Sequence, residues 1–356
     1  MKSSPYITWA KERAGLRYTL ARSGAPLCTE QELGAQPEDL QLCSGDEDGW
    51  MPLREAVGNR YGVSADQVAL THGATHANML VAALLLDDGD AVLFERPGYG
   101  ALFDLLELQG TRVVRFERHG SEDGDPLVGS VERALVPHTR LVVLSNPHNP
   151  TGRHGRESEL AELGALAEVE GIHVLVDEIY MDLAEPDRIR SAAALSPRFL
   201  ATGSLTKSFG LGAVRLGWVL GEADLAERIR RLNDLFTLVI AHPSERLALR
   251  ALETAEAILT PRRELLRRNR PIVDAFVASR SELTWTVPEV GTVGWVCLQD
   301  ASPDDLAALL EREYESSVAP GRFFDVPDHF RIGFAMPEED LEEALDRLGQ
   351  ALDRLA

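Results

Sequence analysis

The middle of the chain alternates short apolar segments with longer helical ones, and this alternation constrains the fold most. From about residue 50 to 220, apolar runs end in polar or glycine-containing clusters, and amphipathic stretches separate them. Such alternation is typical of βα units around a mostly parallel sheet. The expected strands are residues 68–71, 91–94, 112–116, 141–144 and 173–176. Ligands of such sheets bind at the carboxyl ends of the strands, so the polar clusters there form the candidate site.

The remainder of the chain has a different character. From about residue 222 a helical pattern runs past Pro243 to Leu252. Beyond it, helical patterns mix with strand candidates at 284–287, 294–298 and 330–334, which predicts a second, smaller α+β part. Arginine pairs at 262–263 and 267–268 lie among leucine and glutamate, and we interpret them as a solvated helix face.

Composition excludes several classes of function. The formal net charge of −21 argues against nucleic acid, because phosphate binding needs a basic face. No apolar run is long enough to span a bilayer, and the N-terminus lacks the apolar core of a secretory signal. Cys28, Cys43 and Cys297 are widely spaced and odd in number, which predicts a cytoplasmic chain without a disulfide framework. His72 and His76 have no third ligand at metal-site spacing, so no metal is expected.

The residues around one lysine are unusual for a solvent-exposed lysine. Lys207 lies in the run Thr202-Gly203-Ser204-Leu205-Thr206-Lys207-Ser208-Phe209-Gly210, and Arg215 follows about two helical turns later. A lysine that forms a Schiff base must be reachable and partly desolvated so that it can lose its proton. Ser204 and Arg215 supply a hydroxyl and a forked cation that can hold a phosphate. The segment therefore suggests a pyridoxal phosphate (PLP) lysine.

Two other clusters follow expected strands. Prolines and a glycine surround Asn149 in a rigid turn, which can aim its amide into the sheet crevice. Asp177 ends the next strand, where its carboxylate could pair with a protonated ring nitrogen, and the phenol of Tyr180 follows. Taken alone, the first cluster can be a purely structural turn and Asp177 a helix N-cap.

Taken together, these clusters match a known family. The motifs lie in the order and at roughly the spacing of the aspartate-aminotransferase-like superfamily of fold type I, which the chain resembles from about residue 24 to 335. The residues that carry this resemblance are Gly73, Ala74, Thr75, Tyr99, Asn149, Asp177, Tyr180, Ser204, Lys207, Arg215 and Arg331. The combination of the lysine and asparagine motifs is highly specific, whereas the glycine turn alone would be weak.

The resemblance implies an α/β architecture with two domains. The large domain, residues 46–254, is expected to hold PLP on a mostly parallel seven-stranded sheet flanked by helices. The small α+β domain is expected from residues 255–356, joined by an N-terminal arm at 1–45. It also implies a homodimer with shared active sites.

The resemblance assigns roles to the cofactor residues. Lys207 is implied to form the Schiff base and later to move the proton between Cα and C4′. Asp177 is implied to keep the pyridine nitrogen protonated, while Asn149 and Tyr180 bind the ring oxygen and Tyr99 stacks on the ring. The phosphate is assigned to Gly73, Ala74, Thr75, Ser204 and Arg215.

The substrate residues follow from the same resemblance. Arg331 is implied to bind the α-carboxylate, assisted by Asn149, with the Gly24 backbone closing over the substrate. The chain departs from the family near Ser44, where many members carry a tyrosine that reaches the partner's phosphate. The neighbouring Asp46-Glu47-Asp48 suggests a preference for cationic amino acids, although an exposed acidic loop without such a role is the stronger interpretation.

The implied reaction is transfer of an amino group from an L-amino acid to a 2-oxo acid. Other PLP chemistry on amino acids, such as that of a β-lyase or a cyclase, stays open because the same ring-holding residues serve it. A PLP-binding sensor is a weaker alternative, since residues 1–45 are too short for a DNA-binding head and Lys207 and Arg331 are present.

Overall fold

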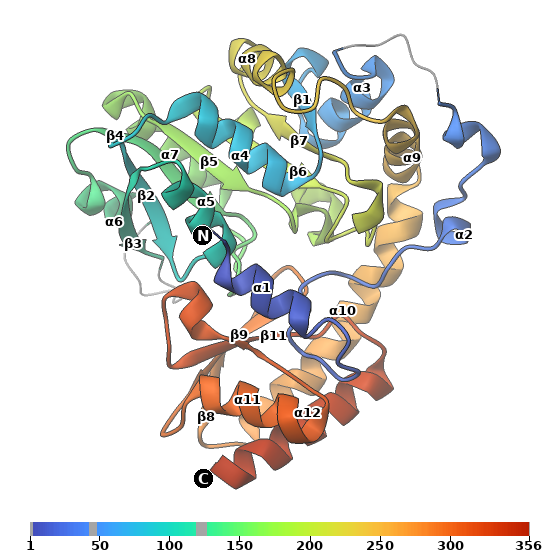
Figure 1. Ribbon diagram of the computed structural model, residues 1–356, viewed down its shortest axis with the longest axis vertical. Helices are drawn as coiled ribbons and strands as arrows, with labels where there is room; N and C mark the ends of the chain where they lie inside the picture. Colours follow the sequence, from blue (N-terminus) through green and yellow to red (C-terminus); the bar gives the residue numbers. More distant parts are fainter. Residues whose placement is uncertain (1–2, 43–47, 119–126, 356) are drawn as a thin grey trace.

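The computed structural model describes residues 3–42, 48–118 and 127–355. It contains two sheets, one in the upper part of Figure 1 and one in the lower part. The larger sheet has seven strands in the order β1-β7-β6-β5-β4-β2-β3, and only β7 runs antiparallel to its neighbours. The predicted mostly parallel, seven-stranded α/β sheet is therefore confirmed.

Five strands of this sheet coincide closely with the predicted ones, and two further strands, residues 199–204 and 217–220, were not predicted individually. In chain order the strands are β1 (Val68–Thr71), β2 (Ala91–Arg96), β3 (Arg112–Glu117), β4 (Thr139–Ser145), β5 (His173–Asp177), β6 (Phe199–Ser204) and β7 (Gly217–Leu220). The helices around them are α3 (Met51–Tyr61), α4 (Ala74–Leu85), α5 (Gly100–Leu108), α6 (Leu127–Ala134), α7 (Glu157–Glu170), α8 (Ala223–Asn233) and α9 (His242–Glu253). The central strands are buried on both faces, as parallel strands covered by helices must be.

The second sheet has four antiparallel strands in the order β10-β11-β9-β8. Its elements are α10 (Ala255–Ala278), β8 (Leu283–Thr286), β9 (Val293–Leu298), α11 (Pro303–Tyr314), β10 (Ala319–Pro320), β11 (His329–Gly333) and α12 (Glu338–Leu355). Helices α11 and α12 pack their leucine-rich faces against this sheet in a core of their own. The division into domains at 45/46 and 254/255 remains a prediction.

The N-terminal arm lies between the two sheets. It carries α1 (Pro5–Glu12) and α2 (Glu30–Leu33), and Figure 1 shows α1 across the junction of the upper and lower parts. Short 3-10 helices complete the structure: η1 (Pro37–Leu40), η2 (Ala65–Gln67), η3 (Met181–Leu183), η4 (Pro186–Arg188), η5 (Ala192–Ala194), η6 (Gly212–Val214) and η7 (Gly321–Phe324). None of the helices in the described ranges combines the length and the hydropathy that a bilayer span requires.

Two expectations from the sequence were wrong. The helical pattern from 222 to 252 is two helices, because the chain turns between α8 and α9, where Leu238 adopts a left-handed conformation with φ of 58°. Arg262 and Arg263 are buried, so they do not form a solvated face. Their guanidinium groups donate to backbone carbonyls of the arm and of η3, which offsets the cost of burying charge.

Candidate active site

A cavity of about 200 Å³ lies at the carboxyl ends of β4, β5 and β6. All the residues assigned to the cofactor except Gly73 line it: Ala74, Thr75, Tyr99, Asn149, Asp177, Tyr180, Ser204, Lys207 and Arg215. Gly73 is next to Ala74 at the start of helix α4. Gly24 and Arg331 do not line the cavity, and their positions are described below.

Lys207 follows strand β6 and extends into the cavity. Its Nζ donates a hydrogen bond to Oγ of Ser23 at 2.8 Å. Part of the side chain faces the cavity, but protein surrounds the amine, and this burial lowers the pKa of Lys207 to about 8. The Arg331 cation lowers the pKa further, while Asp177 opposes the shift. A lysine with this pKa is partly neutral, and so nucleophilic, near neutral pH.

Asp177 ends strand β5 and is buried beside the cavity. Its carboxylate accepts hydrogen bonds from Nδ2 of Asn78 at 3.1 Å and from the backbone N–H of Ile179 at 3.1 Å. Oγ1 of Thr202 in turn donates to Oδ1 of Asn78 at 2.6 Å, which fixes the amide. Burial raises the pKa of Asp177. The site is therefore suited to a cationic partner in the cavity.

The other end of the cavity is suited to an anion. Helix α4 begins at Ala74, so its first backbone N–H groups have no partner within the helix. The φ of Gly73 is +84°, and a Cβ on this residue would lie 2.8 Å from Nη2 of Arg215. Arg215 is exposed at the cavity, where its guanidinium donates to the carbonyls of His72 at 3.0 Å and of Gly212 at 3.2 Å. These contacts hold the cation beside the helix N-terminus.

Arg331, on strand β11, is fully buried. Its Nη1 donates to Oδ1 of Asn149 at 3.1 Å, and its Nη2 donates to the hydroxyl of Tyr6 at 2.7 Å and the carbonyl of Ala21 at 3.1 Å. Its Nε has no hydrogen-bond partner. Within the described residues, no carboxylate forms an ion pair with it. A buried cation without an anion is costly, so this residue fits an anionic ligand.

The N-terminal arm closes one side of the cavity. The hydroxyl of Tyr180 donates to the carbonyl of Ser23 at 2.9 Å, and the N–H of Ala25 donates to the carbonyl of Lys207 at 2.8 Å. A Cβ on Gly24 would lie 3.7 Å from Cδ of Lys207, so the arm lies directly against this side chain.

A buried network supports Asn149, and the sequence did not indicate it. The N–H of Asn149 donates to Oγ of Ser145 at 3.0 Å, and that hydroxyl donates to Glu95 at 2.6 Å. Arg118 donates to the other carboxylate oxygen of Glu95 at 2.7 Å. Burial raises the pKa of Glu95 to about 7, although Arg118 and Ser145 oppose the shift. Only the position of Glu95 and Ser145 at strand ends could have identified them.

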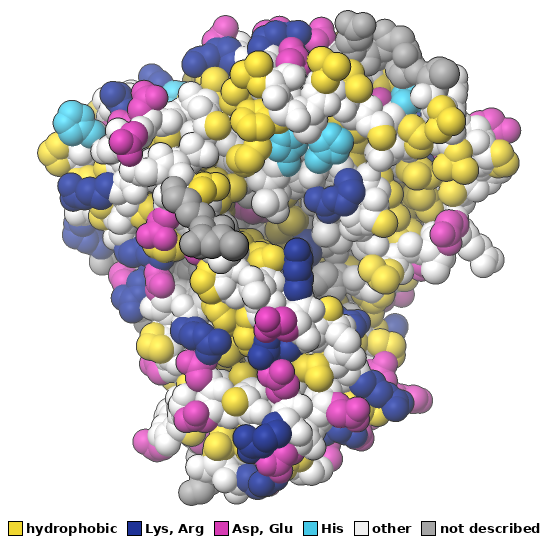
Figure 2. Space-filling model, in the orientation of Figure 1, with side chains coloured by type: hydrophobic (Ala, Val, Ile, Leu, Met, Phe, Trp, Pro, Cys, Tyr) yellow, Lys and Arg dark blue, Asp and Glu magenta, His cyan; other side chains and the backbone are white. Residues whose placement is uncertain are grey.

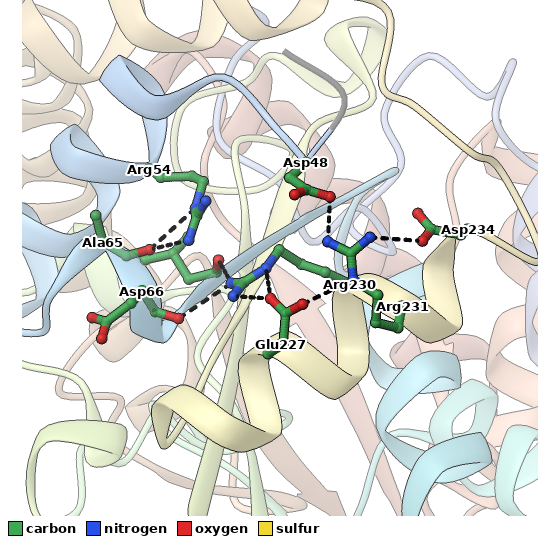
Figure 3. A network of polar contacts seen from close by, with 9 residues as sticks. Asp48, Arg54, Ala65, Asp66, Glu227, Arg230, Arg231 and Asp234 are labelled. Carbon is green, nitrogen blue, oxygen red and sulfur yellow. Dashed lines mark hydrogen bonds and ion pairs between the residues drawn. The ribbon is translucent and has the colours of Figure 1, made fainter.

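The acidic segment before α3 is only partly described. Ser44, Asp46 and Glu47 lie outside the described residues. Figure 3 shows that Asp48 faces Arg231 of helix α8, with which it forms an ion pair. Arg231 also pairs with Glu227. Asp234 pairs with Arg231 as well, so Asp48 shares this one cation with two other carboxylates.

One group of possible metal ligands lies elsewhere. Cys297, Asp328 and His329 place their ligand atoms within 4.8 Å of one another on the second sheet. None of the three lines the cavity. His72 and His76 stack on each other, with ring centroids 5.7 Å apart.

Comparisons with known proteins agree on one family. Residues 41–348 match the family model described as aminotransferase class I and II. The chain is 30% identical to capreomycidine synthase of Streptomyces vinaceus, over 99% of this chain and 94% of that one. A PLP-dependent aminotransferase from Streptococcus suis superposes with a TM-score of 0.90 at 27% identity, covering 100% of this chain and 99% of that one. The PLP-dependent cyclase OrfR superposes with a TM-score of 0.90 at 26% identity, covering 100% and 98%.

Proposed function

Because the chain belongs to the aminotransferase class I and II family and is a PLP-dependent transaminase, we propose that the cavity around Lys207 is its catalytic site. The enzyme moves an amino group from an L-amino acid to a 2-oxo acid. The observation that carries the assignment is that Lys207, with its lowered pKa, and the buried carboxylate of Asp177 face the same cavity. Lys207 is the residue that binds the aldehyde of the cofactor covalently.

The residues of the cavity fit PLP at both ends. The N-terminus of α4, with Gly73, Ala74 and Thr75, supplies backbone donors for the phosphate. Ser204 and Arg215 add a hydroxyl and a cation there.

The ring is assigned to the other side chains of the cavity. Asp177 binds the ring nitrogen, Tyr99 covers a ring face, and Asn149 and Tyr180 bind the ring oxygen. The raised pKa of Asp177 is consistent with this role, because a cationic ring nitrogen is the partner that the buried carboxylate lacks.

When bound, PLP withdraws electrons from the Cα atom of the substrate. Asp177 keeps the proton on the ring nitrogen, which the electron withdrawal requires. When its amine is no longer bound to the cofactor, Lys207 accepts the proton from Cα and delivers it to C4′. A single amine thus acts as general base and then as general acid. Arg331, with Asn149, holds the α-carboxylate, and Gly24 lies where the arm closes over the substrate.

Borohydride reduction followed by peptide mapping tests the covalent assignment. The pyridoxyl group is expected on the peptide that contains Lys207, and Lys207→Arg is expected to leave no label. Lys11, exposed on helix α1, offers a control, because Lys11→Arg should not change the labelling. A label on any other residue would refute the assignment of Lys207.

A second candidate is cyclisation of an amino acid, which the capreomycidine synthase relative and the cyclase OrfR support. The ring-holding residues are common to both reactions, so the fate of the amino group distinguishes them. With an amino-acid panel that includes arginine, lysine and ornithine, a transaminase yields a 2-oxo acid and retains the amino group on the cofactor. A cyclase returns the cofactor unchanged and releases a cyclic amino acid, and a β-lyase releases ammonia.

We also propose that the enzyme is a homodimer with shared active sites. The turn between α8 and α9 exposes four large apolar side chains: Leu235, Phe236, Leu238 and Val239. Figure 2 shows hydrophobic side chains gathered over this region. A second copy would bury them, and Phe236 contacts His76 on α4, whose N-terminus is the proposed phosphate site. A fully active monomer in light scattering would refute this proposal.

The cellular location is proposed from the cysteines. Cys28 and Cys297 are free thiols, which supports a reducing compartment such as the cytoplasm, while Cys43 lies outside the described residues.

A further inference from the structure

The proposed carboxylate-binding residue cannot be reached from the cavity in this conformation. Arg331 is completely buried and does not line the cavity. Its two terminal nitrogens already donate to Asn149, Tyr6 and Ala21. An amino-acid carboxylate can therefore touch Arg331 only if one of these neighbours moves.

Tyr6 is the neighbour that is easiest to displace. It lies on the short helix α1, and Arg331 is the hydrogen-bond partner of its hydroxyl in the structure, whereas the backbone of Asn149 is held by the Ser145–Glu95 network. The ring of Tyr6 packs edge-on against Tyr99, with centroids 5.3 Å apart, and against Phe323 at 5.4 Å.

The phenol of Tyr6 binds Arg331 as a carboxylate oxygen would. Its oxygen accepts from Nη2 at 2.7 Å, so it satisfies one N–H of a buried cation that has no carboxylate partner in the described chain. A neutral phenol does this less well than a carboxylate, because hydrogen bonds between two charged groups are stronger. An α-carboxylate can therefore form a stronger bond to Arg331 than the phenol of Tyr6 does.

We propose that Tyr6 occupies the place of the substrate α-carboxylate on Arg331, and that amino-acid binding displaces Tyr6 together with helix α1. This inference rests on the proposed role of Arg331. It makes the N-terminal helix a gate that opens for ligands with a carboxylate. Because only the open enzyme binds the amino acid, the apparent affinity is the intrinsic affinity multiplied by the fraction of enzyme that is open.

The variant Tyr6→Phe tests the sign of this effect. It keeps the ring and its packing but removes the hydroxyl, so it weakens the closed state only. We expect KM for the best amino donor to fall about tenfold, which corresponds to about 1.4 kcal/mol. The decarboxylated amine of the same donor should show no change, since it does not need Arg331. If Tyr6 instead helped to bind the carboxylate, KM would rise.

A binding measurement that needs no turnover supports the kinetic one. Propionate is titrated against the holoenzyme, and sodium chloride at matched ionic strength gives the baseline. Propionate should raise the melting temperature more in Tyr6→Phe than in the wild type. Hydrogen exchange of residues 5–12 should accelerate in the wild type when propionate binds, and should already be faster in Tyr6→Phe without ligand. Tyr18→Phe is the matched control. Tyr18 also lies on the arm, but its ring packs under Arg347, whose Cζ is 4.1 Å from the ring centroid, and it makes no contact with Arg331 in the structure.

The outcomes separate the gate from the proposed function. An unchanged or raised KM in Tyr6→Phe, or helix exchange that does not respond to propionate, would overturn the gate while leaving the assignment of Arg331 intact. If wild-type enzyme reacts equally well with the amino acid and its amine, or if propionate does not stabilise it, both the gate and the role of Arg331 fail. The role of Lys207 depends on neither result.

Discussion

Glu178, next to the proposed ring-nitrogen partner, should make the cofactor-free protein less stable as the pH rises. It is 5% exposed, and its carboxyl group accepts a hydrogen bond from the N–H of Ala192 at 2.7 Å. Burial raises the pKa of Glu178 from its ordinary value of 4.5 to about 8; the Ala192 N–H opposes the shift, and Asp177 and Asp182 add to it. We expect Glu178→Gln to remove this dependence, because an amide stays neutral and keeps the acceptor oxygen.

The sign and size follow from proton linkage. Because the folded-state pKa is the higher one, the stabilising contribution of Glu178 is fully present below about pH 4.5 and is lost as the pH rises to about 8. The slope is about 1.4 kcal/mol per pH unit, so the total loss is on the order of 5 kcal/mol. The variant should therefore be close to the wild type at pH 5 and more stable by several kcal/mol at pH 8.5.

Urea unfolding of the cofactor-free protein at pH 5, 7 and 8.5 measures this difference. Cofactor-free protein is the right sample, because ligand binding adds a stabilisation of its own. Glu170→Gln, at an exposed carboxyl group at the end of α7, is the control and should show no pH-dependent difference. The reasoning about Glu178 is refuted if its variant differs from the wild type by the same free energy at all three pH values.

Three further predictions concern the proposed site. Asp177→Asn removes the charge paired with the ring nitrogen and should lower kcat at least a hundredfold, since breaking a buried charge pair costs about 3–5 kcal/mol; steady-state kinetics of cofactor-saturated enzyme check this, and a change below tenfold would contradict the role. The rate of PLP loading onto Lys207 should rise about tenfold per pH unit below pH 8 and level off above it, because the neutral amine dominates there; stopped-flow absorbance that keeps rising to pH 10 would disprove this. Ser145→Ala leaves the N–H of Asn149 and the Glu95 carboxylate each short of a partner, so equilibrium dialysis should show weaker PLP binding and urea unfolding a loss of about 1–3 kcal/mol; unchanged values in both assays would show that the network does not support the site.

The sequence predicted the local features of the fold well. Five of the seven strands of the large sheet were evident because their apolar runs are short and end in turn residues, as at Val68–Thr71 and His173–Asp177. Strands β6 and β7 were not identified from the sequence. Strand-end positions likewise indicated Asn149 and Asp177, and the small, hydroxyl-bearing and glycine neighbours of Lys207 indicated that residue. The structure brings all three to one cavity. The turn between α8 and α9 was missed because the apolar period continues through Leu235 without a glycine or proline before Pro243.

The contacts that the sequence did not reveal join distant parts of the chain. Tyr6 and Arg331 are 325 positions apart, and no local pattern relates them. Asn78 has no local signature in the sequence, since its bond to Asp177 depends on how α4 packs on β5. Arg262 and Arg263 were misjudged because their partners are carbonyls of the arm and of η3, which have no signature in the sequence.

Helix α10 connects the two sheets. Its 24 residues span about 36 Å at 1.5 Å per residue. Near one end, Arg262 holds the carbonyl of Pro26 in the arm and Arg263 holds that of Asp182, while the other end packs in the core of the small sheet. From Arg262 to Ala278 the helix spans about 24 Å, so a tilt of about 5° at the anchored residues would shift the far end by about 2 Å. Helix α10 therefore connects the arm next to Gly24 to the small sheet, whose strand β11 carries Arg331.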